Sequence, residues 1–150
     1  MIRDDIKAAL ITAMKAGDKA GTGALRLIQS AIKNRDIEAR TGKAPADDDA
    51  LVIEVLQKMV KQRRESIEMY VKGNRPELAD AEAAEVAVIE RFLPQQMDDA
   101  QTRAAIDAIK AEIGATGLKD MGRLMAELKA RHASEIDMSK ASALVKAALG

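Results

Sequence analysis

The chain has 150 residues, with 24 basic and 24 acidic side chains, so its formal net charge at neutral pH is zero. It contains no Cys and no Trp, and it has one His, one Tyr and one Phe. The missing Cys excludes disulfides, thiolate zinc sites and a Cys nucleophile. The charge balance argues against a uniformly basic nucleic-acid binder, and two aromatic residues cannot form a platform for base stacking.

The sequence indicates a soluble protein of the cytoplasm without a membrane partner. The first residues, Met1-Ile2-Arg3-Asp4-Asp5, lack the apolar core of a secretory signal. No apolar run approaches the roughly 20 residues that are needed to cross a bilayer. The absence of Cys fits a reducing compartment.

Helical periodicity predicts an all-α protein with seven helices and no strand. Gly, Pro and Asp residues mark the helix ends, and the Asp47-Asp48-Asp49 cluster supplies N-caps for the third helix. The expected helices cover residues 2–16, 22–40, 49–72, 76–93, 99–113, 118–131 and 137–149. Pro94 and the segment after it predict a domain boundary, with a four-helix domain at 1–94 and a three-helix domain at 95–150.

Charged residues occur on the predicted apolar faces of the third and fourth helices. At about 100° per residue, Arg63 falls within the apolar arc of the third helix, and Glu82 and Glu85 fall on that of the fourth. One interpretation is a structural ion-pair network that fixes the register of the two helices, since a buried charge without a partner is costly. The other is a pair of carboxylates for acid–base work or metal binding.

Two residues of the sixth helix stand out. His132 follows the line of its apolar side, which predicts packing or capping of helix carbonyls rather than chemistry. Gly122 falls in mid-helix, where Gly costs roughly 1 kcal/mol against Ala. We therefore expect it to serve close approach of another helix or of a partner.

Motifs for catalysis and cofactor binding are missing. The sequence has no phosphate-binding Gly loop, nucleotide fingerprint, nucleophile elbow or zinc pattern. Gly17, Gly21 and Gly23 indicate only a turn between helices, and we expect Gly21 and Gly23 to weaken the first turn of the second helix. The sequence therefore predicts no catalytic residue, no cofactor and no metal.

Several segments together resemble the GatB/YqeY family of small bacterial proteins. The resemblance covers nearly the whole chain, and it is carried by residues 14–19, 25–28, 30–34, 58–68, 73–79, 82, 85, 92–96 and 119–125. It implies a four-helix N-terminal domain and a C-terminal domain similar to the tail of the B subunit of the tRNA-dependent amidotransferase. The family label is carbon–nitrogen ligase activity with glutamine as amido-N-donor, but the residues offer nothing to bind ATP or release ammonia.

The resemblance favours a non-catalytic module that associates with tRNA or another RNA. Cations of the C-terminal part would contact phosphates, and a glycine would allow close approach; these candidates are Lys119, Gly122, Arg123, Lys129, Arg131, Lys140 and Lys146. The same cations also fit an ordinary solvated surface. The alternatives are a protein-interaction or structural module, and an accessory of amidotransfer acting in trans.

The zero net charge conceals an uneven distribution along the chain. Residues 1–75 hold 15 basic and 11 acidic groups, residues 76–99 hold 1 and 7, and residues 100–150 hold 8 and 6. Local phosphate-binding surfaces therefore remain compatible with the neutral total. The aromatic count still excludes a reader that stacks bases.

Overall fold

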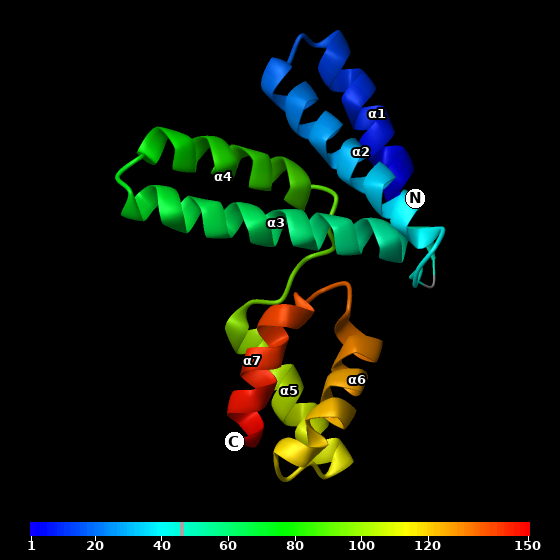
Figure 1. The fold of residues 1–150 in the computed structure, drawn as a ribbon, viewed down its shortest axis with the longest axis vertical. Coiled ribbons are helices and arrows are strands. Elements are labelled where there is room, and N and C mark those ends of the chain that lie inside the picture. Colours follow the sequence, from blue (N-terminus) through cyan, green and yellow to red (C-terminus); the bar gives the residue numbers. More distant parts are fainter. Residues whose placement is uncertain (46) are drawn as a thin grey trace. The chain divides into compact units, whose positions relative to one another are not determined.

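A computed structural model describes residues 1–45 and 47–150, and it confirms an all-helical fold with seven α-helices and no strand in these ranges. The elements, shown in Figure 1, are α1 (Ile2–Lys15), α2 (Lys19–Ala39), α3 (Asp48–Lys72), α4 (Pro76–Glu90), α5 (Asp99–Ile113), the short 3₁₀ helix η1 (Leu118–Asp120), α6 (Met121–His132) and α7 (Met138–Leu149).

Three helix boundaries differ from those expected. Helix α2 begins at Lys19, before the two glycines that were expected to weaken its first turn, because the Asp18 carboxylate accepts the backbone N–H of Gly21 and caps the helix. Helix α4 ends at Glu90 rather than near Phe92. The sixth expected helix is split into η1 and α6.

The chain forms two compact units, Met1–Leu93 and Pro94–Gly150. In the first unit α3 and α4 run side by side in opposite directions, as do α1 and α2 (Figure 1). Their apolar faces form one core around the fully buried Ile6, Ile28, Val52 and Leu56. Independent folding of the two domains predicted at 1–94 and 95–150 stays a prediction, for which a test is given below.

The second unit has a core of its own between α5, α6 and α7, centred on Ile106, Leu124, Leu128 and Val145. A capping box starts α5: Asp98 accepts the N–H of Gln101, whose side chain accepts the N–H of Asp98. Across residues 1–45 and 47–150, no helix is both long enough and apolar enough to span a bilayer.

Candidate nucleic-acid interface

A short turn presents Lys119 at the start of α6. The Asp120 carboxylate accepts the backbone N–H of Thr116 at 2.9 Å, and the N–H of Asp120 donates to the Gly117 carbonyl at 2.9 Å. The N–H of Thr116 holds the pKa of the Asp120 carboxyl below its usual range. The charged form of Asp120 therefore closes the turn, and Lys119 lies exposed on its surface.

One face of α6 is apolar and buried, and the opposite face is open. Leu124 and Leu128 are fully buried in the second core. At about 100° per residue, Gly122, Ala126 and Lys129 form a strip on the other side, and all three are exposed. We call these three residues, with Lys119 before them, the open strip.

Gly122 lies in the first turn of α6 rather than in mid-helix, because α6 begins at Met121. A Cβ atom placed on Gly122 would meet no atom within 4 Å. Internal helix packing therefore does not require a glycine at this position. Close approach of another helix, one of the two reasons expected from the sequence, is not found at this position, and contact with a partner stays a prediction.

The predicted phosphate-binding cations fall into two groups. Among the described residues, no carboxylate lies within ion-pairing distance of Lys119, Lys129 or Lys146. The others have carboxylate partners: Arg123 pairs with Asp120 at 3.2 Å, Lys140 with Asp99 at 3.0 Å, and Arg131 with Glu112 at 2.7 Å and Glu127 at 3.2 Å. Spacing along the chain indicates the pairs with Asp120 and Glu127, which lie three and four residues away, but not those with Asp99 and Glu112, which come from another helix.

Arg131 connects α6 to α5. Its Nη1 and Nη2 atoms donate to the two carboxylate oxygens of Glu112 at 2.7 and 2.9 Å. This fork of hydrogen bonds holds the pKa of the Glu112 carboxyl below its usual range. Arg131 is therefore occupied inside the second unit, unlike the lysines of the open strip.

His132 ends α6 and is half-buried. Its Nδ1 atom is buried without a hydrogen bond, 3.6 Å from the Glu135 carboxylate. Its backbone carbonyl accepts the N–H groups of Glu135 and Ile136 in the following turn. These contacts are compatible with the packing role expected from the sequence.

Charged residues of α3 and α4 form an ion pair that is partly buried between the two helices. Arg63 Nε donates to Glu85 Oε2 at 2.8 Å, and the two side chains are 15% and 35% exposed. Glu82 is half-buried and forms no ion pair within the described part of the chain. The sequence analysis did not find a second bridge between these helices, from Arg64 to Glu90 at 2.6 Å.

The Glu85 carboxylate is thus paired with Arg63, which argues against the alternative of two carboxylates for acid–base work or metal binding. Within residues 1–45 and 47–150, no three His, Asp or Glu residues gather where they could hold a metal ion. The structural role of Arg63, Glu82 and Glu85 and the absence of a catalytic centre stay predictions.

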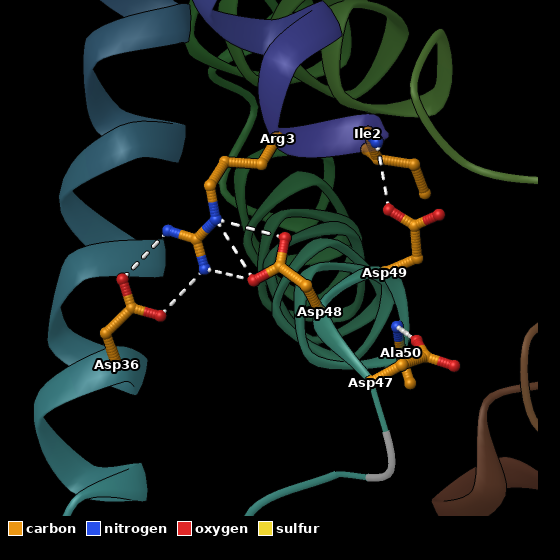
Figure 2. A network of polar contacts seen from close by, with 7 residues as sticks. All are labelled: Ile2, Arg3, Asp36, Asp47, Asp48, Asp49 and Ala50. Carbon is orange, nitrogen blue, oxygen red and sulfur yellow. Dashed lines mark hydrogen bonds and ion pairs between the residues drawn. The ribbon is translucent and has the colours of Figure 1, made fainter.

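A network around Arg3 was missed by the sequence analysis. Figure 2 shows the Arg3 guanidinium between two carboxylates, donating to both oxygens of Asp36 on α2 and to Asp48 on α3. The neighbouring Asp49 accepts the backbone N–H of Ile2 at 3.0 Å, while Asp47 caps α3. Three consecutive Asp residues thus have three different partners, and Arg3 joins α1 to both α2 and α3.

Replacing Arg3 with Met is expected to lower the free energy of unfolding by about 1–2 kcal/mol, because a forked, partly solvated contact to two carboxylates is lost. Arg3 holds the pKa of the Asp36 carboxyl below its usual range. Its contribution is therefore complete above the unfolded pKa of about 4 and is lost as the pH falls below it.

Urea unfolding at pH 6 and pH 3 measures this effect. The difference between wild type and Arg3→Met should shrink at the lower pH. Lys7→Met is the matched control, because Lys7 is exposed on the same helix and forms no ion pair in the described structure. Equal losses for the two variants at pH 6 would contradict the role of the network.

Comparison with known proteins places this chain in a family. The model of the Yqey-like protein family matches residues 3–149. A protein of Vanderwaltozyma polyspora is 30% identical over 123 residues, which cover 77% of this chain and 64% of that protein. A protein of Saccharomyces cerevisiae is 29% identical over 120 residues, which cover 76% and 61%. Both are named "Altered inheritance of mitochondria protein 41, mitochondrial".

The matched part of the chain spans a little under two thirds of the length of these two relatives. Their printed names assign them to mitochondria, so the expectation of a cytoplasmic protein is wrong by this comparison. That expectation rested on the missing features of a secretory signal and on the missing Cys. Neither feature distinguishes the cytoplasm from mitochondria. The similarity to the amidotransferase tail stays a prediction. The match over nearly all of the sequence shows that this chain belongs to the YqeY-like protein family.

Proposed function

We propose that the chain is a non-catalytic RNA-associated module, with tRNA as the first candidate, and that η1 and α6 contact its phosphate backbone. The observation that carries the proposal is the exposed Gly122, whose missing side chain fills no internal need. It lies between Lys119 and Lys129, two exposed lysines that form no ion pair with any described carboxylate. A polyanion can therefore come close to the helix backbone between two exposed lysines, of which Lys119 also acts electrostatically on the Asp120 carboxyl.

The composition of the second unit supports backbone contact rather than base readout. Residues 94–150 contain no Phe, Tyr or Trp, so no base can stack on an aromatic ring there. Cations and small residues suit contacts with phosphates and sugar hydroxyls, whose positions depend on the shape of the RNA rather than on its base sequence. The module is thus proposed to recognise the shape and the negative charge of RNA rather than its base sequence.

Arg123 has a smaller part in this proposal than Lys119 and Lys129. Asp120 lies 3.2 Å from the Arg123 guanidinium, and its carboxylate also closes the turn before α6. A phosphate at Arg123 must compete with this fixed negative charge. Arg131 and Lys140 hold helices of the second unit together instead.

Titration of labelled tRNA with wild type and with Gly122→Leu tests the proposal. A leucine has space at this position, so the thermal midpoint should stay within a few degrees of wild type. Its side chain would keep phosphates from the helix backbone, and we expect about tenfold weaker binding at low salt. Binding by wild type should also weaken steeply from low to moderate salt. No binding at low salt, or unchanged affinity of Gly122→Leu, would overturn the proposal.

Protein interaction is a second candidate function, and a feature of α3 favours it. Met69 and Val71, near the end of this helix, are 73% and 64% exposed. The two side chains lie about 200° apart around α3, so each offers a separate apolar contact to another protein rather than one patch. Pull-downs with and without nuclease separate the two functions: partners that survive nuclease and are lost in Met69→Ser/Val71→Ser favour α3, and partners lost with RNA favour the open strip.

A further inference from the structure

A hollow of about 380 Å³ lies at the turn between α1 and α2, in the first unit. It is a shallow depression that is widely open to solvent. Its lining combines one apolar side chain with polar and charged groups and with glycines: Met14, Gly17, Asp18, Lys19, Thr22, Gly23 and Arg26. From the sequence this segment was interpreted only as a turn.

The two cations of the hollow lie on one side of α2. Lys19 and Arg26 are seven residues apart, which is about two helical turns, so they point within about 20° of each other. Both are exposed, and no carboxylate of the described chain lies within ion-pairing distance of either. Most arginines of the first unit differ in this respect, because Arg3, Arg35, Arg63, Arg64 and Arg75 all pair with carboxylates.

Thr22 and Gly23 lie between these cations on the same side of the helix. The hydroxyls of Thr12 and Thr102 donate to the carbonyl oxygen four residues earlier, whereas the Thr22 hydroxyl has no hydrogen-bond partner among the described residues. A Cβ atom on Gly23 would meet nothing within 4 Å. An interior helical glycine costs roughly 1 kcal/mol against Ala, and internal packing does not account for it here.

Gly21, the other glycine in the first turns of α2, differs from Gly23 because a contact within the chain accounts for it. A Cβ atom on Gly21 would clash with the carboxylate of Asp18 that caps α2. Gly21 therefore makes room for the cap in its present geometry, and Gly23 does not. The absence of a side chain at Gly23 leaves the helix backbone open toward the hollow, between a hydroxyl and two cations.

We infer that this hollow binds one phosphate group of an RNA chain. Lys19 and Arg26 supply two positive charges, and Asp18 supplies one negative charge. The remaining single positive charge matches a phosphodiester, which carries one negative charge, better than a phosphate monoester. The Thr22 hydroxyl donates a hydrogen bond to the same group, and Gly23 lets the sugar–phosphate chain pass close to α2.

This inference rests on the proposed function for the choice of RNA, but its residues are separate from the open strip. It adds a contact in the first unit to that in the second. The chemistry of a phosphodiester is shared with phospholipid headgroups, so the experiment includes vesicles as a separate arm.

Backbone amide NMR of the full chain reports on both surfaces in one titration. The probes are a short synthetic RNA and vesicles that contain phosphatidylglycerol. With RNA we expect shifts at residues 19–26, and about tenfold weaker binding there in Lys19→Ala/Arg26→Ala. The matched control is Lys7→Ala/Lys33→Ala, which removes two exposed cations of the same unit outside the hollow and should leave these shifts unchanged.

The possible outcomes separate the two proposals. Shifts at 19–26 whose apparent affinity falls about tenfold in the double variant support the inference, even if residues 119–129 do not respond and the proposed function of the second unit fails. Shifts at 119–129 alone overturn the inference and leave the proposed function standing. Shifts at 19–26 that keep the wild-type affinity in the double variant, or that occur with vesicles and not with RNA, also overturn it.

Discussion

Replacing Leu128 with Ala is expected to make the C-terminal unit unfold at a lower temperature while the N-terminal unit stays folded. Leu128 is fully buried in a core formed only by residues of the second unit. Loss of such a side chain costs about 3 kcal/mol, including the cavity that remains. At roughly 0.05–0.15 kcal/mol per residue, a unit of this size has only about 3–9 kcal/mol to lose.

The aromatic residues provide a probe for one unit alone. Tyr70 is the only Tyr, the chain has no Trp, and both of its aromatic residues lie within 1–93. Tyrosine fluorescence therefore reports on the first unit, while far-UV circular dichroism reports on the helices of both. In Leu128→Ala we expect an early loss of helix signal on heating, with the tyrosine transition unchanged.

Leu56→Ala is the matched variant, because Leu56 is equally buried in the other core. It should lower the tyrosine transition and leave the helix signal of the second unit in place. If both signals move together in both variants, the chain unfolds as one cooperative body. The division into domains predicted from the sequence would then be wrong.

Helices were predictable here because their signals are local. The Asp98 capping box, Pro76 at the start of α4 and the glycine after Ile113 each lie within a few residues of the boundary that they define. The boundary at α2 was misplaced for a reason of the same kind. Gly21 and Gly23 suggested a weak first turn, but one of these glycines makes room for the Asp18 cap.

The candidate sites were less predictable because they depend on which charges meet across helices. Arg131 and Lys129 are both cations of α6, yet only Arg131 pairs with carboxylates: Glu127 lies one turn earlier, whereas Glu112 on α5 could not be expected from local spacing. Likewise nothing local to Arg3 indicates that Asp36 and Asp48 surround it, since the three residues come from three helices. Pairs between residues this far apart in the sequence can be identified only once the fold is known.

The uneven charge distribution gains a physical meaning from these pairs. Two carboxylates of the acidic segment 76–99, Glu85 and Glu90, bind the α3 arginines Arg63 and Arg64. Part of the cationic excess of the first unit is thus neutralised inside it. The cations without partners are then the informative ones, and they include Lys19 and Arg26 at the hollow and two lysines of the open strip.

Charge reversal of these two lysines should have the largest effect on RNA affinity. In Lys119→Glu/Lys129→Glu, two contacts of about 1 kcal/mol each are lost and replaced by repulsion, so we expect binding of tRNA at low salt to weaken about 30-fold or more. The slope of log affinity against log salt concentration should become less steep by roughly 2, because each lost phosphate contact removes about 1 from the slope. Neither lysine forms an ion pair in the described structure, so the thermal midpoint should fall only slightly, through the loss of the Lys119 charge near the Asp120 carboxylate.

A matched control separates a local contact from the overall charge. Lys129→Glu and Arg103→Glu each change the net charge by the same amount, and both residues are exposed in the second unit. Arg103 lies on α5, outside the open strip. If RNA binds through the strip, Lys129→Glu should weaken binding several-fold more than Arg103→Glu. Equal losses would mean that RNA senses only net charge, and the assignment of the interface to α6 would then be wrong.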